Sequence, residues 1–471
     1  MDAHGAGRPR RPDLGVAGTV ARRSEVDERA SPLAGDWAPP VGEERPVTSS
    51  RRGEFDGGAF AALRDPQYRL LWSSGMLATT AFMMSFMLMP ALAYDITGSN
   101  ASAGIATMGS GLGMFFIAPI GGVIADRVRK KPMVLVGQIV PGIVILLIGL
   151  LVVTDSISIV LLTLGTMVMG FGFAFMGPAR QAWMAELVPP RLLANAVAVQ
   201  QIGQTAAQVL APLGIALLVG TVLGVGGTYL VMASLFLIIL PVTMKLRNTP
   251  PAVSREDRRS VGVELSAGGR YLFGDPQLRL LWASFVVVIV CGFAFQTLLP
   301  GFLDQVLDHD ATDIGPVFLA FALSGLLVNL GLARIIGGSL MWPVMLGMGL
   351  LMAAGFAALA VTPSYGFVLL AAIPLGMGRS GFMMLNQTLL LSNTRPEFYG
   401  RVTSMTMMAF GSQALLAPVW GVLADSIGIR NTLLIVGSVA VVALCAAAVV
   451  WLRFRTDGQR AAAPAPAVPA G

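Results

Sequence analysis

Long apolar stretches separated by short polar loops fill most of this 471-residue chain. Twelve of them are long enough to cross about 30 Å of hydrocarbon. Their approximate cores are residues 71–93, 102–124, 132–153, 157–178, 194–219, 226–245, 279–300, 314–336, 339–361, 364–387, 401–423 and 431–452. We therefore predict an all-α membrane protein with twelve transmembrane helices. A transmembrane β-barrel is excluded, because its strands would alternate polar and apolar residues over segments of about ten residues.

One longer charged segment, residues 246–278, divides the spans into six and six. The pattern predicts an N-terminal six-helix bundle over 70–245 and a C-terminal six-helix bundle over 279–455, joined by a cytoplasmic linker over 246–278. Residues 1–69 are polar and contain no apolar run of signal-peptide length. We interpret them, and the low-complexity residues 456–471, as disordered cytoplasmic tails.

The two halves of the chain share sequence. Asp65-Pro-Gln-Tyr-Arg-Leu-Leu-Trp72 recurs 210 residues later as Asp275-Pro-Gln-Leu-Arg-Leu-Leu-Trp282, just before the first span of each half. Ala211-Pro212 similarly recurs 206 residues later as Ala417-Pro418. A membrane-entry signal explains the residue types but not their repeated order, so a duplication is favoured. A tandem repeat of six spans predicts two bundles related by an axis along the membrane normal, with the substrate site between them.

Composition and charge narrow the class of protein. Hydrophobic residues make up 55% and charged residues 12% of the chain, against roughly 25% charged in an ordinary soluble protein. This excludes a soluble enzyme, a nucleic-acid-binding module and a disordered protein. Of the 32 lysines and arginines, all but Arg379 and Arg430 lie in the tails or in loops at one end of the predicted helices, Arg180 among them. The positive-inside rule then predicts cytoplasmic N- and C-termini, and we expect a bacterial inner-membrane location.

Metal and catalytic chemistry find little support. Cys291 and Cys445 both lie in apolar runs, and His4 and His309 are far apart and outside the spans. Neither HExxH nor a pair of intramembrane aspartates occurs. We predict that the protein is not an enzyme, with no cofactor and no metal site.

Short motifs point to a family. The loop between the second and third predicted spans reads Gly121-Gly122-Val-Ile-Ala-Asp126-Arg127-Val-Arg129-Lys130-Lys131. It resembles the G-x-x-x-D-R-x-G-R-R/K signature of the major facilitator superfamily, with Arg129 where that family usually has glycine. Other stretches resemble the twelve-span drug:proton antiporter subgroup that contains macrolide and siderophore exporters; they are Tyr94–Ser99, Gly177–Gln181 with Asn195-Ala196, and Pro396–Val402. In the family this loop is understood as a conformational latch.

The loop itself has chemistry that fits a latch. A helix N-terminus and neighbouring guanidinium groups both stabilise a carboxylate, so the cluster can hold the bundles together on the cytoplasmic side. The alternative is that these charges only fix the topology. The candidate latch residues are Gly122, Asp126, Arg127, Arg129, Lys130 and Lys131.

Embedded polar and adaptable side chains are candidates for the cavity. Gln200, Gln204 and Gln208 are spaced to share one helix face, either lining a cavity or hydrogen bonding between helices. Arg379 lies within a span, where it either snorkels to the membrane surface or contacts an anion or carboxylate. The other candidates are Met84, Met87, Phe173, Gln296 and Gln413, which offer an adaptable apolar wall with two amides or simply fill space between helices.

Energy coupling rests on fewer residues. No Asp or Glu lies near the middle of any predicted span, and a proton-coupled carrier needs a titratable group whose exposure changes between states. Asp126 and Asp304 are the candidates, with the proton gradient as the energy source. The alternatives are a facilitator, or a charged substrate that responds to the membrane potential.

Taken with the resemblance, these features predict a secondary transporter that exports a small hydrophobic or amphipathic molecule, such as a drug, siderophore or natural product, by alternating access. An importer or facilitator of a small solute and a non-transporting membrane sensor are the alternatives. We expect the partners to be a small-molecule substrate and the lipid bilayer, with no nucleic acid, and the protein to be monomeric.

Overall fold

The computed structural model describes residues 60–248, 261–310, 312–332, 340–395 and 398–461. All regular elements in these ranges are helical. They are the 3₁₀ helices η1 (Ala61–Arg64) and η2 (Pro190–Leu192) and the α-helices α1 (Pro66–Thr97), α2 (Asn100–Arg127), α3 (Lys130–Val153), α4 (Ile159–Leu187), α5 (Leu193–Leu218), α6 (Gly224–Met244), α7 (Val261–Gly274), α8 (Pro276–Leu307), α9 (Gly315–Leu332), α10 (Met341–Ala360), α11 (Tyr365–Ser392), α12 (Tyr399–Leu415), α13 (Ala417–Ile427) and α14 (Ile429–Ala461).

Eleven helical segments in the described residues are long and apolar enough to cross a membrane, which confirms the all-α membrane fold. The predicted span 102–124 falls on α2, whose side chains are not described over residues 118–127, so the number twelve stays a prediction. The span 401–423 is divided at Leu416 into α12 and α13. Pro418 follows this break, and a proline has no N–H to continue the hydrogen bonding of a helix.

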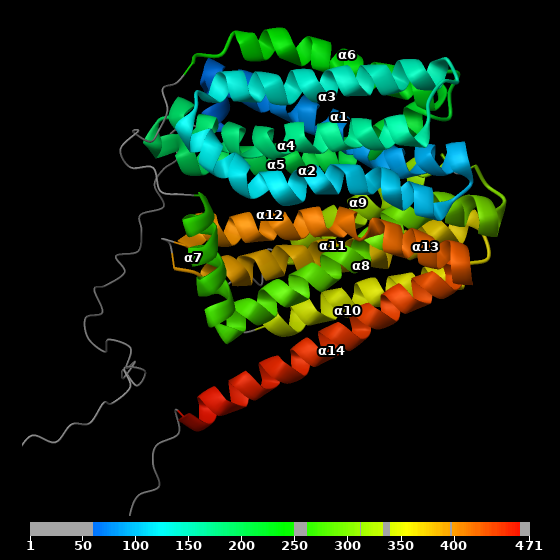
Figure 1. The fold of residues 1–471 in the computed structure, drawn as a ribbon. Coiled ribbons are helices and arrows are strands. Elements are labelled where there is room, and N and C mark those ends of the chain that lie inside the picture. Colours follow the sequence, from blue (N-terminus) through cyan, green and yellow to red (C-terminus); the bar gives the residue numbers. More distant parts are fainter. Residues whose placement is uncertain (1–59, 249–260, 311, 333–339, 396–397, 462–471) are drawn as a thin grey trace, which may run out of the picture. The chain divides into compact units, whose positions relative to one another are not determined.

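The linker contains an element that the hydropathy pattern did not predict. Within residues 246–278, α7 runs across the neighbouring helices rather than along them (Figure 1). It packs on α12 so closely that a Cβ added at Gly268 would lie 2.7 Å from the Cβ of Arg401. The linker therefore attaches to the second half of the chain.

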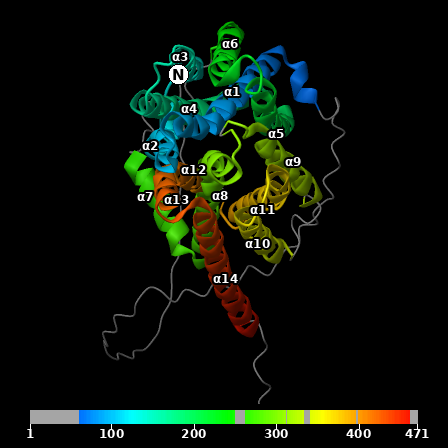
Figure 2. The ribbon, with the colours of Figure 1, turned by 90° about the vertical axis from the view of Figure 1, so that its right-hand side faces the viewer.

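Helices α1–α6 lie side by side in one group, here called the first half, and α8–α14 form the second half (Figures 1 and 2). Two ends of the helices are named by their charges. The acidic end carries Asp95, Asp155, Asp304, Asp308 and Asp425, and the arginine-rich end carries Arg64, Arg129, Arg191, Arg270 and Arg395. This separation matches the charge asymmetry of the sequence.

The repeated octapeptides form equivalent contacts in the two halves. Asp65 caps α1 by accepting hydrogen bonds from the backbone N–H groups of residues 67 and 68, and Asp275 caps α8 in the same way. The Trp72 indole donates to the carbonyl of Val199 at 2.8 Å. Its repeat, Trp282, donates at 3.4 Å to the carbonyl of Met405, which lies 206 residues after Val199.

A second pair of contacts repeats deeper in the bundles. Arg180 of α4 donates to the carbonyl of Leu71 at 3.1 Å. Asn386 of α11, 206 residues later, donates to the carbonyl of Leu281 at 3.0 Å, which is the repeat of Leu71. Arg180 thus belongs inside a bundle and not to a loop, because α4 extends to Leu187, beyond the predicted boundary at 178.

The first helices of the halves, α1 and α8, meet through equivalent positions. The Gln296 amide of α8 donates to the carbonyl of Phe86 in α1 at 2.9 Å, and these positions are 210 residues apart. Tyr94 and Asp304, also 210 apart, share a hydrogen bond of 2.7 Å. Contacts between equivalent residues are expected where a pseudo-two-fold axis passes between α1 and α8.

Part of each predicted tail is helical. Residues 60–69 contain η1 and the start of α1, and the backbone N–H of Ala62 donates to the Asn195 side chain at 2.9 Å. Tyr68 is buried and donates to the carbonyl of Ala196 at 2.6 Å. The apolar residues between Phe60 and Leu63 give this segment a surface to bury. At the other terminus α14 extends through Ala461. The remaining tail residues lie outside the described part of the chain.

Candidate functional site

One face of α5 is exposed along part of its length and buried along the rest. Gln204, Gln208, Ala211 and Ile215 lie within about 60° of one another around the helix. Gln204 and Gln208, toward the arginine-rich end, are exposed, whereas Ala211 and Ile215, toward the acidic end, are buried. The exposed leucine Leu217 lies on roughly the opposite side of α5. On the α5 side, the interface is therefore uncovered toward the arginine-rich end and closed toward the acidic end.

A carboxylate of the second half closes the acidic end by capping a helix of the first half. Asp425, near the end of α13, accepts hydrogen bonds at the N-terminus of α2 through both of its oxygens. Oδ1 accepts from the backbone N–H of Asn100 at 3.0 Å and from its side-chain amide at 2.8 Å. Oδ2 accepts from the Ser99 hydroxyl at 2.7 Å and the Ala101 N–H at 2.9 Å. A negative charge here is also favoured by the helix dipole.

Glycines allow the backbones of the two halves to touch at this end. A Cβ at Gly104 of α2 would lie 2.6 Å from the Cα of Pro418, and one at Gly421 of α13 would overlap the carbonyl oxygen of Asn100. On the other side of the interface, a Cβ at Gly315 of α9 would lie 2.5 Å from the backbone nitrogen of Ala216 in α5. Any larger side chain would hold the acidic end open.

Asp304, one of the two predicted coupling residues, also lies at this closed interface. Its carboxylate is exposed and accepts the hydrogen bond from the Tyr94 hydroxyl across the halves. Asp126, the other candidate, belongs to the residues whose side chains are not described.

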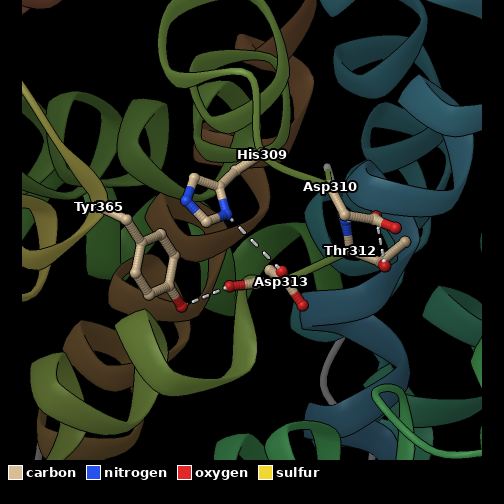
Figure 3. A network of polar contacts seen from close by, with 5 residues as sticks. All are labelled: His309, Asp310, Thr312, Asp313 and Tyr365. Atoms are coloured by element: carbon tan, nitrogen blue, oxygen red, sulfur yellow. Dashed lines mark hydrogen bonds and ion pairs between the residues drawn. The ribbon is translucent and has the colours of Figure 1, made fainter.

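The loop between α8 and α9 is held to the second half by its own network (Figure 3). Asp310 accepts hydrogen bonds from the backbone and hydroxyl of Thr312 at 2.8 and 2.6 Å. The Tyr365 hydroxyl of α11 donates to the carbonyl of Asp313 at 3.0 Å, and the His309 ring lies 4.8 Å from the Tyr365 ring. These contacts tie the loop to α11 and not to the first half.

An aromatic run crosses from the first half to the second. Phe173 of α4 stacks on Phe82 of α1 with ring centroids 3.9 Å apart, Phe82 stacks on Phe86 at 6.1 Å, and Phe86 lies 5.6 Å from Phe293 of α8. We call Phe173, Phe82, Phe86 and Phe293 the aromatic run. The hydrogen bond from Gln296 to Phe86 lies beside it.

Arg379 lies close to the point where the aromatic run reaches α8. A Cβ at Gly292, next to Phe293, would lie 2.9 Å from the Cδ of Arg379. The guanidinium carbon is 6.0 Å from the centre of the Phe321 ring. Arg379 lies about 180° around α11 from the exposed Leu370, so it points away from the lipid-facing side of that helix.

The remaining cavity candidates take different places. Met84 is buried against Gly214 of α5, and Met87 is half-buried. Gln200 is half-buried on the same side of α5 as Gln204. Gln413 is only 5% exposed, and its Oε1 has no hydrogen-bond partner in the described residues. Gln413 therefore sits between packed helices and not on an open surface.

The described latch residues bind within their own half. The Lys130 ammonium is fully buried and pairs with Glu186 of α4 at 2.7 Å. Lys131 donates to the carbonyls of Met244 and Leu246 at 2.6 and 2.8 Å, at the end of α6. Arg129 is exposed and precedes α3. The prediction for Gly122, Asp126 and Arg127 lies outside the described side chains.

Sequence reasoning missed Asp425, Phe82, Phe86 and Gly292. The repeat carried a usable signal for three of them, because Phe82 and Gly292 are 210 residues apart and Phe86 is the repeat partner of Gln296. Asp425 had no such signal, since its partners in α2 are more than 320 positions away in sequence.

We expect solvent to reach position 204 of α5 and not position 215, although both lie on the same face of the helix. In a Cys445→Ser background, which removes the exposed native thiol and leaves buried Cys291, Gln204→Cys should react quickly with a water-soluble maleimide. Ile215→Cys, about 16 Å further along the helix, should stay unmodified in the native protein and react after denaturation. Equal labelling of the two cysteines would contradict an interface closed only at the acidic end.

Comparisons with known proteins give the family and the fold. The family model of the Major Facilitator Superfamily matches residues 71–412. No curated protein sequence matches the chain at a significant level.

Solved transporter structures share the fold at low sequence identity. The nucleoside transporter NupG superposes with a TM-score of 0.65 at 14% identity, covering 82% of this chain and 99% of that one. A bacterial homologue of the human lysosomal transporter Spinster, in an inward-facing and unoccupied conformation, gives 0.67 at 15% identity, covering 83% and 98%. A POT family transporter in complex with 5-aminolevulinic acid gives 0.67 at 12% identity, covering 82% and 96%.

Proposed function

Since the chain belongs to the major facilitator superfamily and is a multi-pass membrane transporter of a small molecule, we propose that it exports a small hydrophobic or amphipathic compound by alternating access. The observation that carries this proposal is the burial along α5. One helix face is exposed at Gln204 and Gln208 and buried at Ala211 and Ile215. A carrier needs an interface that opens at one end while it stays closed at the other.

The direction of opening follows from charge. Lysine and arginine accumulate at the cytoplasmic side of membrane proteins, so the arginine-rich end faces the cytoplasm. The state described here is then open to the cytoplasm and closed to the outside, ready to take up a cytoplasmic substrate. Release outside requires the opposite state, in which the cap of Asp425 on α2 and the hydrogen bond between Tyr94 and Asp304 are broken.

The chemistry of the middle of the interface supports an apolar or amphipathic substrate. The aromatic run places apolar rings between the halves, and Phe86 and Phe173 are only half-buried. Met87, which follows Phe86 in α1, is also half-buried and has a flexible side chain that adapts to varied ligands. The Gln296 amide is a polar group at the same level. Substrate selects between states only through its different affinity for each of them.

Coupling to protons is assigned to Asp304. Its carboxylate accepts the Tyr94 hydrogen bond at the closed acidic end, and it is exposed at the surface that would face outside. Protonation from that side removes the negative charge that the Tyr94 hydroxyl stabilises, which favours opening outward. In this mechanism a proton enters as the substrate leaves.

The test is dye efflux from bacterial cells that express the protein. Cells loaded with N-phenyl-1-naphthylamine, which is neutral, or with 8-anilino-1-naphthalenesulfonate, an anion, should lose at least one dye faster than cells without the protein. Collapse of the proton gradient with an uncoupler should abolish the difference, and Asp304→Asn should lower it at equal expression. Faster accumulation of dye would instead support an importer, and unchanged content of both dyes would defeat the proposal.

A further inference from the structure

Among the equivalent positions at which the two halves differ, one pair in mutual contact lies in the middle of α1 and α4 and of their counterparts α8 and α11. In the first half the pair is Phe82 and Phe173, whose rings stack at 3.9 Å with planes 11° apart. In the second half the positions 210 and 206 residues later are Gly292 and Arg379. The hydrogen bonds of Arg180 and Asn386 to repeated carbonyls establish that α4 and α11 are equivalent with an offset of 206.

The two changes in this pair are complementary. A Cβ at Gly292 would lie 2.9 Å from Cδ and 3.0 Å from Nε of Arg379, so glycine leaves the space that the arginine stem occupies. Each residue thus fits the other, as the two phenylalanines fit each other in the first half. The contact between these positions is present in both halves, as a stacked aromatic pair in the first and as an arginine stem against a glycine in the second.

Among the described residues, Arg379 has no partner for its charge. Its Nε is buried without a hydrogen bond, and no carboxylate among the described side chains lies within ion-pair distance of it. The Phe321 ring, 6.0 Å away, is its one aromatic contact in the described residues. An unpaired charge within a membrane span costs several kcal/mol, and a bound anion would offset that cost.

Arg180 is a second buried arginine within a helix, and comparing it with Arg379 distinguishes a structural role from a binding role. It is also buried in a span, and its Nε likewise has no hydrogen bond in the described residues, but another of its guanidinium nitrogens donates to the Leu71 carbonyl, a contact that the neutral Asn386 repeats. A packing role therefore explains Arg180. The residue of the first half that is equivalent to Arg379 is Phe173, whose ring carries no charge and no hydrogen-bonding group. The repeat therefore provides no packing contact that would account for a charged residue at position 379.

We propose that Arg379 and the aromatic run form two sides of one site that selects amphipathic organic anions. The flat apolar part of the ligand lies against Phe173 and Phe86, the two half-buried rings of the run, and its carboxylate or sulfonate binds the guanidinium. Charge-assisted hydrogen bonds to a guanidinium are about twice as strong as neutral ones. This inference rests on the proposed transport function and narrows its substrate class from hydrophobic or amphipathic molecules to anionic ones.

The test compares probes of one shape and different charge. Equilibrium dialysis with the purified full-length protein in nanodiscs, corrected for empty nanodiscs, measures the Kd of 2-naphthalenesulfonate, neutral 2-naphthalenesulfonamide and 2-naphthylmethylammonium. The wild type should bind the sulfonate at least about tenfold more tightly than the sulfonamide, a difference of about 1.4 kcal/mol, and the ammonium most weakly.

Variants of Arg379 and of its neighbour Gly292 test whether Arg379 causes the tighter binding of the sulfonate. Arg379→Gln should reduce the sulfonate-to-sulfonamide ratio to about one while leaving sulfonamide binding unchanged, and Arg379→Lys should keep part of the ratio. Gly292→Ala, which retains the arginine but crowds its stem, should lower the ratio to an intermediate value. Arg395→Gln removes an exposed charge from the same half and should behave as wild type.

Equal binding of the sulfonate and sulfonamide by the wild type, a ratio that survives Arg379→Gln, or binding of neither probe would overturn the inference. If Arg379→Gln does not fold, the inference is tested by the sulfonate-to-sulfonamide ratios of Gly292→Ala and Arg379→Lys. Both ratios should lie below that of the wild type, and wild-type ratios in both variants would overturn the inference. This readout needs no transport. A lost preference for anions with intact efflux of the neutral dye defeats the inference alone, and absent efflux of both dyes defeats the proposed function alone.

Discussion

Gly421→Ala should reduce transport at least about tenfold. A Cβ at this position of α13 would overlap the carbonyl oxygen of Asn100 and lie 2.8 Å from the Cα of Ala101. Both are backbone atoms of α2, so they cannot rotate away as a side chain would. Overpacking of this kind costs roughly 1–3 kcal/mol, which acts on the closed state of the acidic end because the contact exists only there. The measurement is the rate of dye efflux at equal expression.

The same variant should change accessibility in a defined direction. Ile215→Cys, unmodified in the parent, should become reactive to a water-soluble maleimide when Gly421→Ala is added, because the acidic end then stays open. The control is Gly177→Ala in α4, where an added Cβ meets no atom within 4 Å; it should leave both efflux and labelling unchanged. Normal efflux with Gly421→Ala would show that α2 and α13 separate without functional consequence.

Asp425→Asn is expected to weaken the same closure by a smaller amount. An amide keeps one acceptor oxygen and gains two donors, so at least one pair of the hydrogen bonds from Ser99, Asn100 and Ala101 is lost. Loss of a helix cap costs about 0.5–2 kcal/mol, and the site is partly in water. We expect the equilibrium constant for closing the acidic end to fall about two- to thirtyfold, measured as faster labelling of Ile215→Cys.

A matched variant separates this effect from a general change in surface charge. Asp155→Asn removes a negative charge at the same end of the first half, and asparagine tolerates the positive φ of 49° at that position. It should leave labelling of Ile215→Cys as in the parent. If both variants accelerate labelling equally, the cap on α2 is not what holds the acidic end closed.

The placement of the candidate residues shows how far sequence reasoning reached. The helices, the repeat and the charge asymmetry were all predictable, as was a polar face on α5. In the structure Gln204 and Gln208 of that face are exposed, and their part in a substrate cavity stays a prediction. Gln413 was indistinguishable from them by sequence, since all are amides in apolar spans, yet it is buried between packed helices. Hydropathy reports which residues are polar but not which helix covers them.

The charged loop after α2 illustrates the same limit. Its residues were predicted to hold the bundles together, which stays a prediction. In this structure the described Lys130 and Lys131 bind Glu186 and the end of α6 within the first half. The interface in this state is held by Asp425 and by glycines at the other end. Whether the halves are joined by the charged loop after α2 or by the residues of the acidic end depends on the conformational state. The sequence contains the residues for the contacts of every state, and it does not indicate which contacts form in a given state.

By itself the sequence determined an all-helical membrane protein with two similar halves and one basic end. It could do so because lipid offers no hydrogen-bond partners to the backbone. Each apolar stretch that is long enough to cross the membrane must therefore form its backbone hydrogen bonds within itself, as a helix does. Only the tertiary structure decided which end of the interface is closed and which polar groups meet there. Those contacts join residues more than 200 positions apart, and they depend on how helix faces pack, which local pattern does not encode.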